Sequence, residues 1–110
     1  MTRPLIVFVV FVLASLSLAA QEVTLPVPIV KSEPEYSYEA RVAKITGSVR
    51  LSVLIGADGV PQEIRVLKSL DPGLDQNAMD AVSKWRFKPG TKDGQPVPVL
   101  TTIEVSFKLL

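Results

Sequence analysis

The chain has 110 residues, enough for one small domain, and it contains neither cysteine nor histidine. Thiol nucleophiles, disulfides and zinc–thiolate sites are therefore excluded, and the commonest general base is missing. Lys and Arg total 12 against 11 for Asp and Glu, a balance that lacks the charge needed for nucleic acid or an anionic membrane surface. The scattered carboxylates imply no acid–base pair, so we expect no enzyme, no cofactor and no metal site.

The first 20 residues have the layout of a secretory signal peptide. Arg3 precedes an apolar run that starts at Leu5, and the segment ends in the small residues Ala19 and Ala20. We expect cleavage after one of these alanines and export of the remainder. The alternative is a retained membrane anchor, because the apolar stretch is only just shorter than the ~17–25 residues of a spanning helix.

Residues 21–33 are predicted to be an extended leader. They contain Pro26 and Pro28 and show no periodicity, which is typical of chain that does not pack. The folded domain is expected to occupy residues 34–110.

Three strands are predicted from alternating apolar and polar residues. The first covers 48–55, the second 60–69 and the third 97–109, and a turn at 56–59 joins the first two as a hairpin. Pro61 lies inside the second strand and cannot donate to a ladder, so this strand is expected at a sheet edge.

Two helices complete the pattern. A short one is predicted near 36–44, and a longer one begins after Asp71, a capping residue followed by a proline. The apolar stripe of the longer helix comprises Leu74, Ala78, Ala81, Val82 and Trp85. The predicted fold is α+β: a two-layer sandwich with a three-stranded antiparallel sheet in the order 2-1-3. Both helices cover one face, and a βαβ-type crossover makes strands two and three parallel.

The stretch Trp85-Arg86-Phe87-Lys88-Pro89 resembles the Trp-Arg-Phe-x-Pro signature of the TonB C-terminal domain family. Other parts of the family pattern stand in the same order, and the resemblance covers about residues 30–110. They are Pro34-Glu35-Tyr36, Ala40-Arg41, Gly47-Ser48-Val49, Asp58-Gly59, Leu74-Asp75 and Gly94-Gln95-Pro96-Val97. The signature residues Trp85, Arg86, Phe87 and Pro89 are expected to be mainly structural. Trp85 is predicted to anchor the core, and Arg86 to pair with a carboxylate or touch a partner.

The resemblance implies a periplasmic module without catalytic activity. Family members bind the short N-terminal box of outer-membrane TonB-dependent receptors as an added strand beside the last strand, and they transmit force from an inner-membrane motor. Complete transducers carry a functional histidine and a long Pro-rich span, neither of which this sequence has. We therefore expect a receptor-binding domain that is exported alone, or one anchored in the inner membrane if the N-terminal segment is retained.

The last predicted strand independently favours strand addition. It would be a sheet edge, and from Val99 to Leu109 it contains no glycine or proline to blunt that edge. The candidate partner-binding residues are Val99, Leu100, Thr101, Thr102, Ile103, Glu104 and Val105. The alternatives are pairing with a second copy as a homodimer, occlusion by the C-terminus, or a stand-alone adaptor for an unrelated periplasmic partner.

Overall fold

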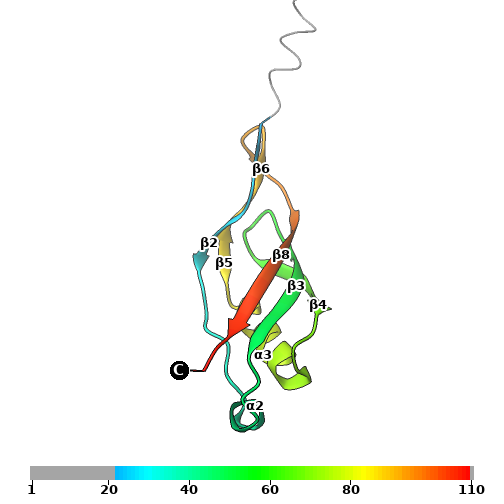
Figure 1. Ribbon diagram of the computed structural model, residues 1–110. Helices are drawn as coiled ribbons and strands as arrows, with labels where there is room; N and C mark the ends of the chain where they lie inside the picture. Colours follow the sequence, from blue (N-terminus) through cyan, green and yellow to red (C-terminus); the bar gives the residue numbers. More distant parts are fainter. Residues whose placement is uncertain (1–21, 110) are drawn as a thin grey trace, which may run out of the picture.

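The structure is a computed structural model that describes residues 22–109, so the predicted signal or anchor segment, 1–20, lies outside the described residues (Figure 1). Within 22–109, no helix is both long enough and apolar enough to cross a bilayer. The helices are α2 (Tyr38–Val42) and α3 (Pro72–Ser83). The strands are β1 (Val23–Thr24), β2 (Val27–Val30), β3 (Gly47–Ile55), β4 (Pro61–Lys68), β5 (Arg86–Lys88), β6 (Thr91–Lys92), β7 (Gln95–Pro96) and β8 (Val99–Phe107).

The three long strands form an antiparallel sheet in the order β4-β3-β8. In the numbering of the predicted strands this order is 2-1-3, and β8 follows β3 in unbroken register from Gly47↔Phe107 to Ile55↔Val99. The pairing of β3 with β4 is interrupted twice by register shifts, and Glu63 in β4 has a positive φ of 48°. The two outer strands therefore differ, because β4 is bulged and β8 is regular.

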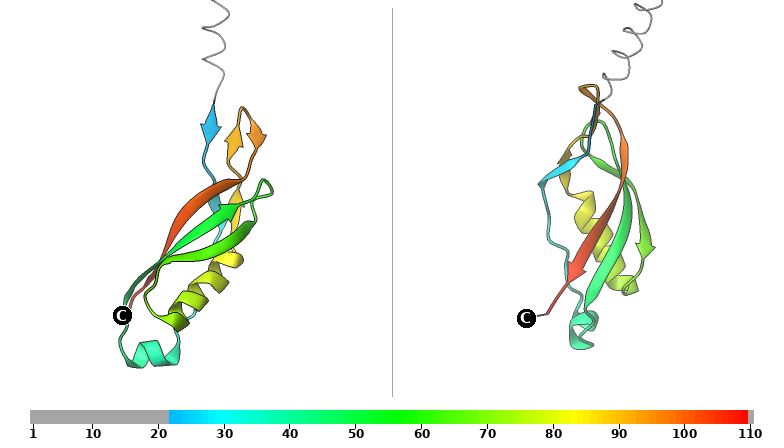
Figure 2. Two further views of the ribbon diagram at one scale, coloured as in Figure 1. Left: turned by 90° about the vertical axis from the view of Figure 1, so that its right-hand side faces the viewer. Right: turned by 45° about the horizontal axis from the view of Figure 1, so that its top comes forward.

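Helix α3 covers one face of this sheet and closes the core (Figure 2). The Asp71 carboxylate accepts the Leu74 N–H at 3.1 Å, and Pro72 stands in the first turn, as the capping pattern predicted. The core consists of Ala40, Val49, Leu51, Val53, Ile55, Leu74, Ala78, Val82, Phe87, Val105 and Phe107. The helix ends at Ser83, so the prediction that Trp85 continues its apolar stripe is wrong.

Helix α2 does not lie on the sheet face, so the prediction of two helices on one face is wrong. Both views of Figure 2 place it beyond the end of the sheet. It has five residues, begins after Ser37, whose hydroxyl accepts the Ala40 N–H at 3.2 Å, and buries only Ala40. So short a helix has no apolar face wide enough to cover a sheet.

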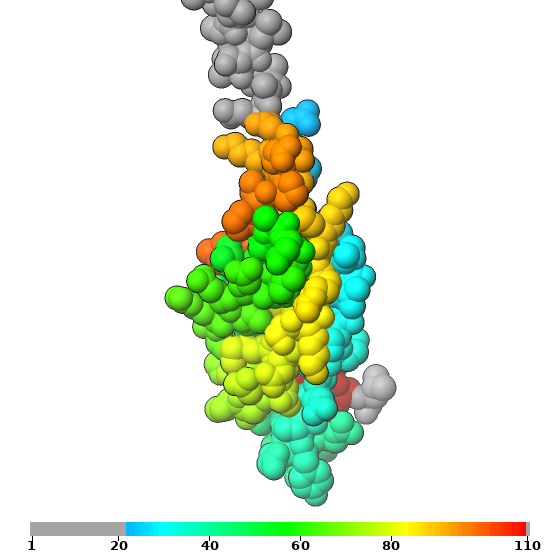
Figure 3. Space-filling view, turned by 180° about the vertical axis from the view of Figure 1, so that it is seen from behind, coloured from blue at the N-terminus to red at the C-terminus, as the bar shows by residue number. Residues whose placement is uncertain are grey.

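The leader is packed, contrary to the expectation for residues 21–33. β2 pairs antiparallel with β5, and β1 pairs with β6, which in turn pairs with β7. Figure 3 shows this segment, in blue and cyan, alongside the end of α3 and the chain that follows it. Extended backbone that contains prolines can still pair with one neighbouring strand. The strands that pair with the leader, β5 and β6, lie more than 50 residues away in sequence, so the local sequence does not predict the pairing.

The hairpin turn at Gly59 fixes the position of β5. Gly59 has a positive φ of 79°, and its carbonyl accepts the Phe87 N–H at 2.9 Å. A Cβ on this residue would lie 2.0 Å from the Phe87 carbonyl oxygen, so only glycine allows the two backbones to approach this closely.

Candidate functional site

Strand β8 is an edge of the central sheet. Among the described residues, 22–109, its only strand partner is β3. Its nine residues span roughly 30 Å at 3.3–3.4 Å per residue. Figure 1 shows this long, straight strand, in red, with β3 on one side only. This is the edge in which the sequence predicted the partner-binding residues.

Two backbone observations establish which groups of β8 point outward. The Gly56 N–H donates to the Val60 carbonyl at 3.1 Å, so residue 56 directs its backbone groups toward β4. Because neighbouring residues in a strand point to opposite sides, Ile55 directs its groups toward β8, where it faces Val99. Pro61, which has no N–H, faces Ile55 on the β4 side, in agreement with this assignment. The unbroken register then gives the residues whose N–H groups point away from the sheet: Leu100, Thr102, Glu104 and Ser106.

The side chains of the predicted edge residues divide between two faces. Val99, Thr101 and Ile103 point toward the helix layer and are half-buried, and Val105 is buried. The other three, Leu100, Thr102 and Glu104, are exposed on the open face of the sheet. The edge therefore has a partly apolar ledge on its helix side and a polar surface on its open side.

The two sheet edges differ in their protection against association. β4 carries Pro61 and the positive-φ residue Glu63, both of which disrupt pairing with a further strand. The charged residue within β8 is Glu104, and its carboxylate is paired with Arg50 of the neighbouring strand at 2.8 Å, on the open face. That ion pair lies above the sheet and does not block the line of outward N–H groups.

The signature residues lie on the helix side of the sheet, where they contact the core and the leader. The half-buried Trp85 packs against the core, and its indole N–H donates to the Ser32 carbonyl at 3.0 Å. The Lys31 ammonium stands 5.4 Å from the Trp85 ring centroid, so the ring holds the leader by two contacts. Phe87 is buried and faces Pro28 across the β2–β5 pair.

Among residues 22–109, the Arg86 guanidinium pairs with backbone carbonyls and not with a carboxylate, and its predicted contact with a partner stays a prediction. Its guanidinium donates to the Ser83 carbonyl at 3.1 Å and to the Trp85 carbonyl at 2.6 Å. These carbonyls lie at and just beyond the C-terminal end of α3, where a cation also interacts favourably with the helix dipole. Arg86 therefore caps the helix. Pro89 follows β5 and is half-buried.

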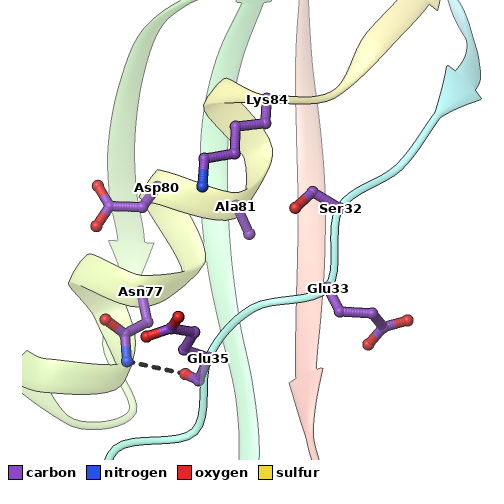
Figure 4. A pocket seen from close by; sticks show the side chains of 7 residues that line it. All are labelled: Ser32, Glu33, Glu35, Asn77, Asp80, Ala81 and Lys84. Carbon is purple, nitrogen blue, oxygen red and sulfur yellow. Dashed lines mark hydrogen bonds between the residues drawn. The ribbon is translucent and has the colours of Figure 1, made fainter.

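A polar cleft of about 170 Å³ lies between the leader and α3 (Figure 4). The Asn77 side-chain amide donates to the Glu35 carbonyl at 2.8 Å and ties the two walls together. In Figure 4 the Glu33 side chain points away from the cleft, and Asp80 extends from the opposite side of the helix. Within the part of the chain that the structure describes, no group of three acidic side chains could share a metal ion. The hydrogen bond from Asn77 to Glu35 holds the leader against the helix at this cleft.

Comparison with known proteins identifies one family. Residues 32–109 match the family model described as Gram-negative bacterial TonB protein C-terminal. The chain is 32% identical over 100 residues to protein TonB of Vibrio cholerae, covering 87% of this chain and 41% of that protein. It is 36% identical over 77 residues to protein tonB2 of Pseudomonas aeruginosa, covering 69% of this chain and 28% of that protein. It thus spans less than half of the length of either relative.

A solved structure shows the same fold. The solution NMR structure of the Pseudomonas aeruginosa TonB C-terminal domain superposes on this chain with a TM-score of 0.64 at 30% sequence identity. The match covers 76% of this chain and 86% of that one. Together these matches establish a small α+β domain with antiparallel sheets and two helices.

Proposed function

The chain belongs to the family of Gram-negative bacterial TonB protein C-terminal domains, and on that premise we propose that it is a non-enzymatic, periplasmic peptide-binding module. It captures the N-terminal box of an outer-membrane TonB-dependent receptor by adding that peptide as a strand to β8, in support of transport across the outer membrane. The peptide-binding residues are those from Val99 to Val105. An N-terminal segment that stays in the inner membrane would keep the same module facing the periplasm.

The observation that carries this proposal is the open edge of β8. A peptide strand laid beside it receives N–H groups from Leu100, Thr102 and Glu104, and the carbonyls of the same residues accept in return. Affinity in such pairing comes from the main chain, so many peptide sequences are tolerated. This suits a module that serves more than one receptor.

The side-chain environment of the edge adds a preference. Peptide residues that point toward the helix layer lie along the half-buried ledge of Val99, Thr101 and Ile103. Burying apolar atoms there is favourable by about 25 cal/mol per Å². Alternate residues of the peptide face solvent beside Thr102 and Glu104, where polar side chains fit. We therefore expect box peptides with apolar residues at every second position.

A homodimer or an adaptor for an unrelated periplasmic partner is the second candidate. The same open edge supports it, because two copies of β8 can pair antiparallel about a two-fold axis. In a homodimer the edge is already paired, so a peptide would bind only by displacing the second copy, and the apparent mass would rise with concentration.

Two adjacent proline substitutions test the proposal. Thr102→Pro removes an N–H that points outward, so we expect a folded domain that binds peptide at least tenfold more weakly. Thr101→Pro removes a donor to β3 and is expected to destabilise the sheet, which checks the assignment of the two sides. Thr102→Ala is the matched control, since it removes the same side chain and keeps the N–H.

The measurement is titration of synthetic receptor-box peptides into each variant, with thermal melting to establish that it is folded. Loss of binding in Thr102→Pro but not in Thr102→Ala supports capture at β8. Wild-type affinity in a folded Thr102→Pro variant would rule out this edge as the site.

A further inference from the structure

A basic hollow lies at the end of the molecule where β8 finishes. Its volume is about 450 Å³, and it is open to solvent; its lining residues are Tyr36, Arg41, Lys44, Lys108 and Leu109. Figures 1 and 2 show why distant segments meet here, since α2 and the C-terminal end of β8 lie at the same end of the fold. We call this feature the basic hollow.

Three of its five lining residues are cations, and none is acidic. Among residues 22–109, the one ion pair within 4 Å joins Arg50 to Glu104, so it involves none of these three. The hollow thus carries concentrated positive charge in a chain whose net charge is only +1. An anion is the ligand that this surface favours.

Two contacts position the Tyr36 ring in the wall of the hollow. The Tyr36 hydroxyl donates to the Ile45 carbonyl, and its ring meets Phe107 edge-on, with centroids 5.5 Å apart. The Arg41 guanidinium stands 5.7 Å from the Tyr36 ring centroid. These contacts hold one cation in place over an aromatic wall, so less side-chain entropy is lost when an anion binds.

The basic hollow adjoins the C-terminal end of β8. Lys108 and Leu109 line it and directly follow Phe107, the last residue of that strand. A peptide strand beside β8 advances about 3.3 Å per residue, so the residues that extend two or three positions past Phe107 reach the hollow.

We propose that the basic hollow binds acidic side chains in the flank of the peptide captured by β8 and so selects among peptides that the edge alone would accept. This inference rests on the proposed function. The flank concerned is N-terminal to the paired residues if the peptide runs antiparallel to β8 and C-terminal if it runs parallel.

Lys44 offers a variant that removes charge without adding strain. It follows α2 with a positive φ of 57°, a conformation in which glycine is favoured and other residues are strained. Lys44→Gly therefore deletes one cation from the hollow while relaxing the backbone. Lys68→Gln is the control, because it removes one exposed cation from β4, at the opposite edge of the sheet.

The experiment uses three capped synthetic peptides that share the core Thr-Val-Thr-Val-Thr. One has five serines at each end, the second replaces the two outermost N-terminal serines with aspartates, and the third replaces the two outermost C-terminal serines. With the core beside residues 100–104, a five-residue flank extends two residues past Phe107, where Lys108 and Leu109 line the hollow. We expect one of the two acidic peptides to bind wild type about three- to tenfold more tightly than the neutral peptide at low salt, as for a few partly exposed charge pairs. The gain should shrink in 0.5 M salt and in Lys44→Gly, but not in Lys68→Gln.

The results separate the two levels of the proposal. If all three peptides bind wild type equally and Thr102→Pro abolishes binding, strand capture stands and the role of the basic hollow is refuted. If both acidic peptides bind more tightly than the neutral one by the same factor, and Lys44→Gly does not change that factor, the role of the basic hollow is refuted. The increase in affinity would then come from general electrostatic attraction. If no peptide binds, the proposed function fails and this inference with it.

Discussion

Asp75 is expected to control the acid stability of the domain. It is almost fully buried at the start of α3, and its carboxylate accepts from the Ser69 hydroxyl, from the Leu70 N–H at 2.9 Å and from the Asp71 N–H at 3.3 Å. Burial raises the pKa of this carboxyl, but the three hydrogen bonds together outweigh burial and hold the pKa below its ordinary value of 3.8.

The sign of the pH effect follows from that direction. A carboxyl whose pKa is lower in the folded state stabilises the fold above its unfolded pKa, and the contribution is lost as pH falls through the folded pKa. The contribution is therefore complete at neutral pH and declines below about pH 4.

The magnitude follows from the bonds that each substitution removes. Asp75→Asn keeps an oxygen for the two backbone N–H groups and loses only charge assistance, so we expect a cost of about 1 kcal/mol at pH 7. Asp75→Ala leaves the N–H groups of Leu70 and Asp71 without their acceptor, at a cost of about 3 kcal/mol. Asp80→Asn is the control, because that carboxylate is exposed on the same helix.

Urea unfolding, followed by the fluorescence of the single tryptophan, measures these differences at pH 7 and at pH 3. The difference in the free energy of unfolding between wild type and Asp75→Asn should be smaller at pH 3 than at pH 7. For Asp80→Asn, the free energy of unfolding should stay close to that of wild type at both pH values. If the difference in the free energy of unfolding between wild type and Asp75→Asn is equal at both pH values, the ionised Asp75 carboxylate does not stabilise the fold.

Two further predictions concern the signature and the N-terminus. Trp85→Ala should lower the free energy of unfolding by about 2 kcal/mol, which is less than for a fully buried ring. Trp85→Phe should lower it by about 1 kcal/mol, because the hydrogen bond to the Ser32 carbonyl is lost. Thermal melts decide this, and an unchanged midpoint in Trp85→Ala would exclude a packing role. N-terminal sequencing of the exported protein should show cleavage after Ala19 or Ala20, and an intact Met1 in a membrane fraction would contradict it.

The long strands and α3 could be predicted because their periodicity is carried by many residues. β3 and β8 each alternate over nine residues, and Pro61 correctly indicates an edge strand. Strands β5, β6 and β7 have two or three residues each, too few for any period, and they exist because other segments lie beside them. The packed leader was missed for the same reason.

Side-chain environments were harder to predict than elements. The spacing along α3 assigns Asp75 to the outer face, yet the loop before the helix folds over it and supplies three donors. Hydropathy cannot show this, because a carboxylate that caps local N–H groups scores as polar wherever it lies. The spacing of Trp85 fits the apolar stripe of α3, but the helix ends at Ser83, before Trp85.

Of the candidate site, the strand was predictable but its chemistry was not. The absence of proline and glycine from Val99 to Leu109 indicates an open edge. Which residues point their N–H groups outward follows from the Gly56–Val60 hydrogen bond and from the register of β3 with its two neighbours, and no pattern within β8 reveals either. The basic hollow draws on Arg41, Lys44 and Lys108, which are brought together only by the fold.

The two proposed uses of β8 are linked, because a peptide and a second copy need the same outward N–H groups. In the central sheet β4-β3-β8, the regular edge is β8, since Pro61 and Glu63 disrupt the edge at β4. Peptide capture and edge-to-edge dimerisation are therefore mutually exclusive at β8. A dimer in an antiparallel arrangement would also occupy the strand without supplying acidic side chains to the basic hollow, because the residues of the second copy that would lie near it precede Val99, and 95–98 are uncharged. If the basic hollow selects acidic peptides as proposed, it favours such a peptide over self-association at β8.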